Sequence, residues 1–162
     1  MSHTRRRRRM AQVLLNMVAR PTAMAYRILV ADDSEPNLQA LLALLQGPGF
    51  EIEAARDGSL ALRLLLDGNF DLSLLDVHMP QLTGIQVVCA LRQVGRPVPS
   101  ILMTGHPSGA LEMAAMEAGA IAMLRKPIPA ELLRITIQRV LTPSPGPPAS
   151  RPGPSGGPPP GF

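Results

Sequence analysis

The strongest constraint on the fold is an alternation that repeats five times between residues 25 and 142, in which a short apolar run precedes a longer segment with helical spacing. Short apolar and β-branched runs favour strands, whereas apolar residues at i, i+3, i+4 and i+7 favour helices. The predicted strands cover residues 26–31, 50–54, 71–76, 98–103 and 120–124. Because parallel neighbours need a crossover between them, this pattern predicts an α/β fold with a parallel sheet between helical layers.

The helix-like segments end at glycines or before a proline, which are common helix-ending residues. The apolar residues of the first three, with the glycine that ends each, are Leu38, Leu41, Leu42 and Leu45 before Gly47, Ala61, Leu62, Leu65 and Leu66 before Gly68, and Ile85, Val88, Cys89 and Leu91 before Gly95. The last two helices are predicted over 110–118 and 131–141. Residues 50–54 alternate polar and apolar side chains, which favours a strand near the sheet edge.

Polar residues follow four of the five predicted strands. In an open parallel sheet, ligands bind beyond the carboxyl ends of the strands. The residues at those ends are Asp32, Asp33, Asp76, Thr104 and Lys126. Three carboxylates at one sheet edge repel one another unless protons or a cation neutralise them. Since Mg²⁺ prefers carboxylate and phosphate oxygens together with retained water, these residues predict a magnesium site.

A carboxylate beside a cation and a lysine can also attack a phosphoryl group, because the positive charges stabilise the transferring oxygens. Lys126 is the only lysine among 16 cationic residues, and its compact ammonium suits a single phosphoryl oxygen better than a planar guanidinium does. The alternative for Asp32 and Asp33 is an ordinary loop before a helix N-terminus, where acids are favoured. Ser34 is predicted to cap that helix.

Five sequence blocks, in order, resemble the receiver domain of two-component response regulators. The blocks are residues 28–34 (ILVADDS), 74–80 (LLDVHMP) with Gly84, 103–106 (MTGH), 117–120 (EAGA) and 124–128 (LRKPI). The resemblance covers about residues 25–142. It implies a flavodoxin-like (βα)5 fold of three layers, with a parallel five-stranded sheet in the order 2-1-3-4-5, an order for which a chemotaxis receiver is a known example.

The resemblance also implies a role for each polar residue at the strand ends. Asp76 is the phosphoacceptor, Thr104 bonds a phosphoryl oxygen, and Lys126 pairs with the acyl phosphate. The implied ligands of Mg²⁺ are Asp32, Asp33, Asp76 and the backbone carbonyl of His78. The family further suggests a cis peptide bond between Lys126 and Pro127, a form that proline makes accessible.

One position departs from the family pattern. Receivers usually carry Tyr or Phe three residues before the lysine, where the ring swings inward as the threonine moves toward the phosphoryl group. Met123 stands at this position, so the switch pair here is Thr104 and Met123. Methionine repacks easily but has no ring and no hydroxyl. We expect the phosphorylation chemistry to be unaffected and the readout to differ.

Other residues have both a structural and a functional interpretation. His78 and His106 each lie two residues after a predicted site residue. We interpret them as rim side chains that control access of water, with a zinc or general-base role as the less favoured alternative. Cys89 is interpreted as a core residue of an apolar helix face. Met113 and Met116 are predicted to be core or partner-facing.

The positive charge lies mainly at the N-terminal end. The formal net charge is +4, but residues 1–23 hold six arginines and no acid, whereas residues 24–142 hold eight arginines, one lysine and all twelve acids. Residues 1–23 are predicted to be a disordered basic leader, with Met24 as a possible true start; a polybasic arm at Arg5 to Arg9 and a targeting segment are the alternatives. Residues 143–162, with nine of the 18 prolines, are predicted to be a disordered tail, and 24–142 the receiver domain.

The favoured function is that of a stand-alone phosphorylation-dependent switch. It takes a phosphoryl group from a sensor histidine kinase or a histidine phosphotransfer protein, and it signals by protein contacts of its fourth and fifth helices. It assists its own phosphorylation and dephosphorylation but is not expected to be an enzyme with outside substrates.

Two other functions are weaker alternatives. Nucleic-acid or anionic-surface binding through Arg5 to Arg9 is disfavoured by an aromatic content of 2%. The second alternative is an enzyme, a magnesium-dependent phosphatase that acts on outside substrates. The single cysteine, Cys89, and the lack of an apolar stretch near the roughly 20 residues needed to span a bilayer predict a cytoplasmic protein without a membrane span.

Overall fold

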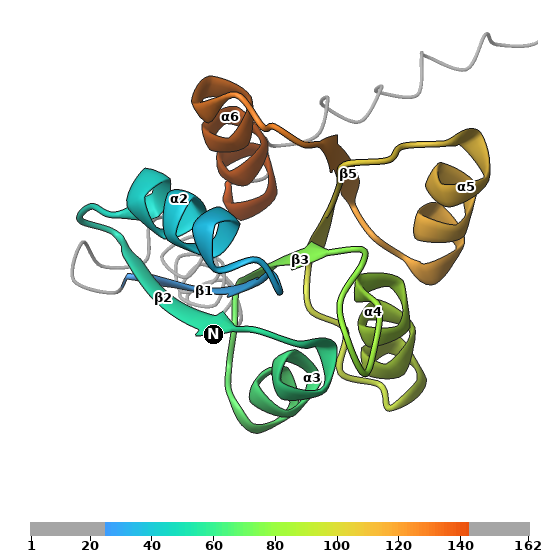
Figure 1. The fold of residues 1–162 in the computed structure, drawn as a ribbon. Coiled ribbons are helices and arrows are strands. Elements are labelled where there is room, and N and C mark those ends of the chain that lie inside the picture. Colours follow the sequence, from blue (N-terminus) through green and yellow to red (C-terminus); the bar gives the residue numbers. More distant parts are fainter. Residues whose placement is uncertain (1–24, 143–162) are drawn as a thin grey trace, which may run out of the picture.

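The computed structural model describes residues 25–142, so the predictions for the leader, the tail and the Arg5 to Arg9 arm lie outside the described residues. Within this range five strands alternate with five helices (Figure 1). In chain order they are β1 (Tyr26–Ala31), α2 (Glu35–Leu45), β2 (Phe50–Ala55), α3 (Gly58–Asp67), β3 (Leu72–Asp76), α4 (Gly84–Gln93), β4 (Ser100–Thr104), α5 (Gly109–Ala118), β5 (Ala122–Arg125) and α6 (Ala130–Leu141). None of these helices is long and apolar enough to cross a membrane.

All five strands are parallel, and their order across the sheet is β2-β1-β3-β4-β5. This order confirms the predicted fold and places β2 at an edge, as its alternating sequence indicated. The chain runs outward from β1 to β2 and then crosses back to β3, which pairs with the other side of β1. The ends of β1 and β3 therefore lie side by side where the winding reverses, and open α/β sheets bind ligands at such a reversal.

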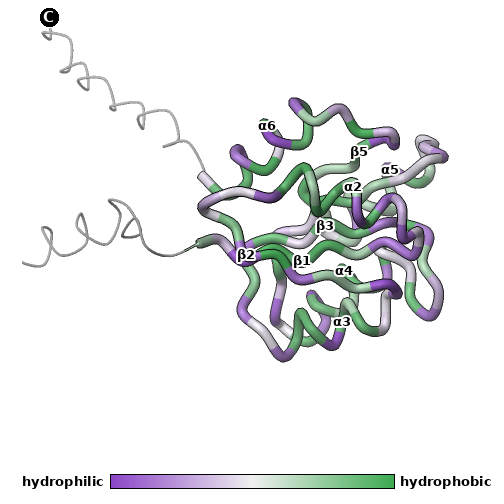
Figure 2. Tube along the Cα trace, turned by 60° about the vertical axis from the view of Figure 1, so that its left-hand side comes forward, coloured by the Kyte–Doolittle hydropathy of each residue, from purple (hydrophilic) through white to green (hydrophobic). Residues whose placement is uncertain are grey.

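Two apolar layers attach the helices to the sheet. One face is covered by α2 and α6, and the other by α3, α4 and α5 (Figure 1). Buried residues of β1 alternate between the layers: Leu29 and Ala31 pack toward α3, α4 and α5, whereas Ile28 and Val30 pack toward α2 and α6. The central strands are accordingly among the most hydrophobic segments of the trace (Figure 2). Burial on both faces explains their nearly continuous apolar sequences.

The predicted strand bounds were wrong by one or two residues at several ends. The fourth strand begins at Ser100 and not at residue 98, because Pro99 has no N–H with which to join the ladder. The fifth begins at Ala122, because the Ala120 N–H donates to the Ala115 carbonyl at 3.0 Å and so belongs to the end of α5. The second and fourth strands extend one residue further than predicted, and the third starts one residue later, at Leu72.

Side chains fix the N-termini of three helices. Asp57 accepts a hydrogen bond from the Leu60 N–H at the start of α3, Thr83 forms a capping box with Gln86 at the start of α4, and Ser108 caps α5. The prediction for Ser34 was wrong in its chemistry. Ser34 holds the cap position of α2, but its side chain makes no cap hydrogen bond. Its N–H instead donates to the Asp32 carboxylate at 2.9 Å, so the acid organises this turn.

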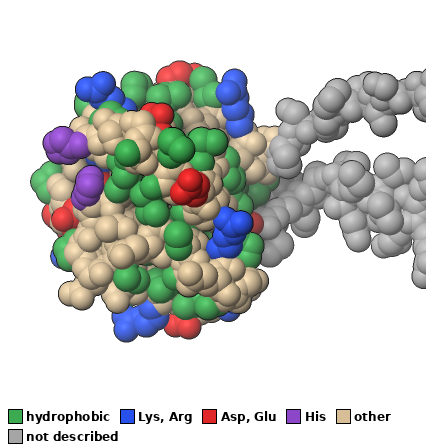
Figure 3. Space-filling view, turned by 90° about the vertical axis from the view of Figure 1, so that its right-hand side faces the viewer, with side chains coloured by type: hydrophobic (Ala, Val, Ile, Leu, Met, Phe, Trp, Pro, Cys, Tyr) green, Lys and Arg blue, Asp and Glu red, His purple; other side chains and the backbone are tan. Residues whose placement is uncertain are grey.

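Large apolar side chains are exposed around α5 and β5. Met113, Met116 and Ile121 are 64%, 76% and 55% exposed. Figure 3 shows apolar side chains gathered on the side of the molecule that carries these elements. Of the two predictions for Met113 and Met116, a core position is therefore wrong and a surface position is confirmed. Cys89, which was interpreted as a core residue, is partly buried and packs against the layer of α3, α4 and α5, so it lies at the border of the core and not inside it.

Candidate functional site

Backbone hydrogen bonds align the strand ends that carry the predicted site residues. The Asp32 N–H donates to the Ala55 carbonyl at 3.1 Å, which ties the end of β1 to the end of β2. The Val77 N–H donates to the Met103 carbonyl, and the Lys126 N–H donates to the Thr104 carbonyl, each at 2.8 Å. These bonds continue the parallel ladders one residue beyond the strands. They hold the residues that follow β1, β3 and β5 at one edge of the sheet.

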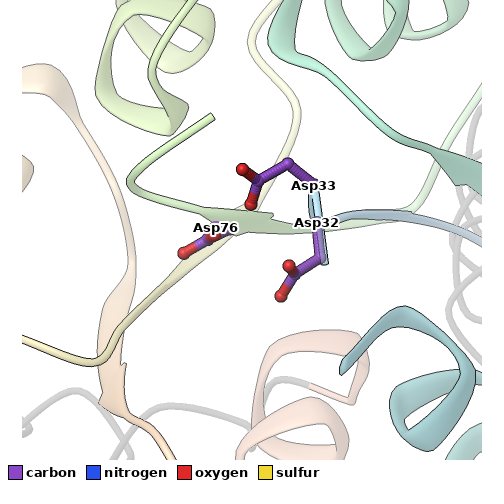
Figure 4. Close-up of side chains that lie close together, drawn as sticks. All are labelled: Asp32, Asp33 and Asp76. Carbon is purple, nitrogen blue, oxygen red and sulfur yellow. The ribbon is translucent and has the colours of Figure 1, made fainter. Parts of the chain in front are cut away.

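Three carboxylates meet at this edge and form what we call the acid pocket: Asp32, Asp33 and Asp76 (Figure 4). One oxygen atom of each lies within 4.8 Å of one oxygen of the others. Asp32 is fully buried, Asp76 is 6% exposed, and Asp33 is exposed. The sequence placed all three at one edge, and the structure brings them together.

Lys126 provides a positive charge inside the acid pocket. Its Nζ lies 2.5 Å from an Asp32 oxygen and 3.3 Å from an Asp76 oxygen. The peptide bond that follows it, between Lys126 and Pro127, is cis, as the family resemblance led us to expect. One ammonium faces three carboxylates, so the pocket keeps an excess of negative charge. That excess favours a bound cation.

Burial and the neighbouring charges together shift the pKa of Asp76. Burial raises the pKa of the Asp76 carboxyl above its ordinary value of 3.8, while the ammonium of Lys126 opposes this rise and the neighbouring Asp32 and Asp33 charges add to it. Burial disfavours the charged carboxylate because the protein interior solvates it less well than water does. Neutralisation of the Asp76 carboxylate by a proton or a cation is therefore favourable in the folded protein.

The donor set of the acid pocket fits a magnesium ion. Carboxylate oxygens that converge on one point, with an exposed member that leaves room for water, are the ligands that Mg²⁺ prefers. The residues that would hold the ion are Asp32, Asp33, Asp76 and, by the family pattern, the backbone carbonyl of His78. The fit rests on the convergence of the three carboxylates and on their uncompensated charge.

Thr104 and the two histidines lie at the same edge of the sheet as the acid pocket, at the end of β4 or on the loops that follow β3 and β4. Thr104 is fully buried as the last residue of β4, and its Oγ1 accepts a hydrogen bond from the His106 N–H at 3.1 Å. His78 and His106 are both exposed, on the loops that follow β3 and β4. Their rings lie edge to face with centroids 6.4 Å apart. The structure thus places them as neighbours on the surface.

Two glycines hold the loop that follows Asp76, and sequence reasoning missed one of them. A Cβ on Gly84 would lie 2.5 Å from the Asp76 carbonyl oxygen, so α4 begins directly against the end of β3. A Cβ on Gly58 would lie 1.9 Å from the Leu82 carbonyl oxygen, and the Gly58 N–H donates to the Pro80 carbonyl at 3.2 Å. The available signal was a glycine at the start of a helix, where its low helix propensity needs a reason.

The comparisons with known proteins agree with this geometry. A family model described as the response regulator receiver domain matches residues 28–138, which is more than half of the chain. The chain belongs to this family. It is a receiver domain of the kind found in two-component response regulators, and such domains generally bind Mg²⁺ at an acidic pocket.

Relatives of this receiver domain include longer proteins. Response regulator MprA of Mycobacterium sp. (strain KMS) is 36% identical over 118 residues, which are 73% of this chain and 51% of that protein. MprA of Mycobacterium tuberculosis (strain ATCC 25177 / H37Ra) is 35% identical over the same length. The receiver domain therefore spans about half the length of the curated relatives that it matches.

Solved structures show the same fold. The chemotaxis protein CheY4 of Vibrio cholerae is 34% identical with a TM-score of 0.68, over 73% of this chain and all of that chain. The receiver domain of the Francisella response regulator 1452 is 28% identical with a TM-score of 0.68, over 72% of this chain and 96% of that chain.

Met123 opens onto the exposed apolar surface around α5 and β5. Met123 lies in β5 and packs partly against the core layer of α5. It also lines a surface hollow together with Met116, Ile121 and Ala122. A change in the packing of Met123 would therefore reach this surface directly. Thr104 lies on the neighbouring strand, where it pairs with Arg125.

Proposed function

We propose that this receiver domain is a phosphorylation-dependent switch of a two-component phosphorelay. It accepts a phosphoryl group on Asp76 from a histidine of a sensor kinase or a histidine phosphotransfer protein, and it signals by protein contacts. The observation that carries this proposal is the position of Asp76. Its carboxylate lies at the carboxyl-terminal edge of the sheet, 3.3 Å from the ammonium of Lys126 and close to two further carboxylates.

We assign each residue of the pocket a separate role in phosphoryl transfer. An Asp76 oxygen forms a bond to phosphorus while the bond from phosphorus to the donor imidazole nitrogen breaks, and that electron pair returns to the imidazole. Lys126 then pairs with a phosphoryl oxygen, and the Thr104 hydroxyl donates a hydrogen bond to another. Mg²⁺ held by Asp32, Asp33 and Asp76 would supply further positive charge to stabilise the phosphoryl oxygens.

The same arrangement supports a limited catalytic role. Asp76 is consumed when it accepts the phosphoryl group, so the protein acts on itself and turns over no outside substrate. Hydrolysis by water later restores the carboxylate, with Lys126 and Thr104 positioned to stabilise the same oxygens. We place this chemistry in the cytoplasm, where a free thiol such as that of Cys89 stays reduced.

The exposed surface of α5 and β5 is the proposed signalling surface. Met113, Met116 and Ile121 present apolar area to solvent there, and methionine adapts to partners of different shape. Met123 lines this surface and belongs to β5, the strand that pairs with β4 and so lies next to Thr104. Because Met123 has no ring, its response to phosphorylation is a change of packing and not the inward swing of an aromatic side chain.

A mass measurement tests the proposal. The protein of residues 1–162 is incubated with Mg²⁺ and a small acyl phosphate donor and then weighed intact. We expect a single phosphate adduct, which is lost in Asp76→Asn. Asp67→Asn is the matched control, because Asp67 is an exposed acid on α3 outside the pocket, and this variant keeps the adduct. An adduct that persists in Asp76→Asn contradicts the assignment, and continuous turnover of a phosphoester by the unmodified protein contradicts the self-acting role.

A further inference from the structure

Two histidines from separate loops lie together at the sheet edge that carries the acid pocket. His78 follows β3 and His106 follows β4, and their ring centroids are 6.4 Å apart at an interplanar angle of 72°. They are the only histidines among residues 25–142. Figure 3 shows two exposed histidine side chains near one another on one face of the molecule. Neither imidazole is used in the phosphoryl transfer proposed above.

The spacing of the two rings is close to the spacing of two imidazole rings that bind the same metal ion. Two imidazole nitrogens about 2.0 Å from one tetrahedral zinc ion place their ring centroids about 5 Å apart. The observed 6.4 Å exceeds this by an amount that rotation of the side chains can close. Both side chains are exposed, so such a rotation meets little resistance from packing.

The charge beside the histidines also favours a cation. The acid pocket holds three carboxylates against the single ammonium of Lys126, and Asp33 is its exposed member. An excess of negative charge near a surface raises the local concentration of cations. Imidazole nitrogens differ in kind from the carboxylate oxygens of the pocket, because imidazole suits zinc and other transition metals whereas carboxylate suits magnesium.

We propose that His78 and His106 form a second metal site, which binds a transition-metal ion such as Zn²⁺ through two imidazole nitrogens, with water at the remaining positions. The site is separate from the acid pocket in ligand type and in metal preference. A bound ion ties the loop after Asp76 to the loop after Thr104. The site needs no phosphorylation and stands independently of the proposed switch.

Calorimetric titration with Zn²⁺ tests this site. The protein comprises residues 1–162 without a histidine tag, and it contains His3→Ala throughout, because His3 is the third histidine of this sequence. Saturating Mg²⁺ is present to occupy the acid pocket, so the titration measures binding by the two imidazoles without the attraction of the free carboxylates. We expect one Zn²⁺ per chain, with affinity about tenfold or more weaker in His78→Ala and in His106→Ala, since even the loss of an outer-shell partner costs a metal site about that much.

Three further measurements locate the bound ion. Zn²⁺ shifts the imidazole NMR signals of both His78 and His106 in the parent protein. Asp33→Asn removes an exposed acid of the pocket and Cys89→Ser removes the thiol, and both keep Zn²⁺ binding. Zn²⁺ also raises the thermal midpoint of the parent and not that of the double histidine variant, because a ligand stabilises the state that binds it.

The site is overturned if the double variant His78→Ala/His106→Ala binds Zn²⁺ as tightly as the parent. It is equally overturned if Asp33→Asn or Cys89→Ser abolishes binding while both histidines are present, because the ion then lies in the acid pocket or at the thiol. Parent protein that binds no Zn²⁺ also contradicts it. The mass adduct on Asp76 is measured without Zn²⁺, so neither experiment decides the other.

Discussion

Lys126 bridges two carboxylates that are largely removed from water. Asp32 is fully buried and Asp76 nearly so, and the ammonium contacts both. Loss of one member of a buried ion pair leaves the other charge without compensation. We therefore predict that Lys126→Met lowers the free energy of unfolding by about 3 kcal/mol in the presence of a chelator. Denaturant titration measures this value, and added Mg²⁺ restores part of it.

An exposed ion pair is the control for that variant. Arg56 lies 2.9 Å from Glu35, with side chains 72% and 48% exposed. Solvent screens such a pair, so Arg56→Met costs less than about 1 kcal/mol and shows no rescue by Mg²⁺. Equal losses for Lys126→Met and Arg56→Met contradict the assigned role of Lys126 in neutralising the pocket.

The raised pKa of Asp76 predicts a pH-dependent cost. Burial is its main cause, and it makes the ionised carboxylate less favourable in the folded than in the unfolded protein. Below the ordinary pKa the group is neutral in both states and costs nothing. As pH rises through the higher pKa of the folded protein, the buried carboxyl ionises in the folded state too. The free energy of unfolding falls over this range.

Asp76→Asn removes this cost because the amide does not ionise. In a chelating buffer we expect the variant to be more stable than the parent at neutral pH and equal to it below the ordinary pKa of a carboxyl. Thermal unfolding across this pH range measures the difference. The exposed Asp67→Asn serves as the comparison, and at neutral pH it should change the thermal midpoint by less than Asp76→Asn does, because solvent screens an exposed charge. A parent that matches Asp76→Asn at neutral pH counts against the prediction.

At the scale of elements, the start of α3 supports the loop that leaves Asp76. A Cβ at Gly58 would meet the Leu82 backbone at 1.9 Å, and backbone atoms cannot turn aside as a flexible side chain can. We predict that Gly58→Ala lowers the free energy of unfolding by about 2 kcal/mol, because overpacking forces the loop to move. Gly109→Ala, which meets nothing within 4 Å at the start of α5, should be neutral or stabilising.

A local readout separates movement of the loop from a general loss of stability. Amide NMR shifts of residues 77–83 should change in Gly58→Ala and stay unchanged in Gly109→Ala. Residue Gln81 in this loop has a left-handed φ of 70°, so the segment already depends on its neighbours for its shape. A Gly58→Ala protein with parental stability and parental shifts in the loop would show that α3 does not support it.

Sequence periodicity predicted the elements well, and the errors have local causes. The apolar spacing of Leu38, Leu41 and Leu45 defined α2 because all three are buried against the sheet. Strand ends were less predictable, since they depend on which backbone groups find partners. Pro99 has no N–H, and Ala120 gives its N–H to the end of α5. Neither effect appears in a hydrophobic pattern.

The site was predictable in membership but not in contacts. The five strand-end residues were identified because parallel strands bring their carboxyl ends to one edge. The direct bond from Lys126 to Asp32 joins residues 94 positions apart and depends on the pairing of several strands. The buried hydrogen bond between Ser73 and Ser100, at 2.8 Å, depends in the same way on the register of β3 and β4. This register is set by contacts between residues that are distant in the chain, so no local pattern of the sequence predicts it.

At the scale of the whole molecule, charge and chemistry are separated along the chain. The formal net charge is +4, although residues 24–142 hold all twelve acids and nine of the 16 basic residues. Every contact described for the acid pocket lies within the same segment. Charges separated by more than about 10 Å are largely screened at 0.1 M salt, so the arginines of residues 1–23 should not govern the pocket unless they lie against it.

A protein that starts at Met24 tests this separation. Removal of residues 1–23 takes away six arginines and no acid, so the formal net charge changes from +4 to −2, whereas removal of residues 143–162 changes it only to +3. We predict that both truncated proteins accept phosphate from a small donor at the parental rate, measured by intact mass. Only the first should lose retention on a cation exchanger or on DNA at low salt, because counterion release depends on the basic residues present. A slower phosphorylation without residues 1–23 would show that the leader contributes to the acid pocket, and unchanged retention on DNA would exclude the arginines as a nucleic-acid contact.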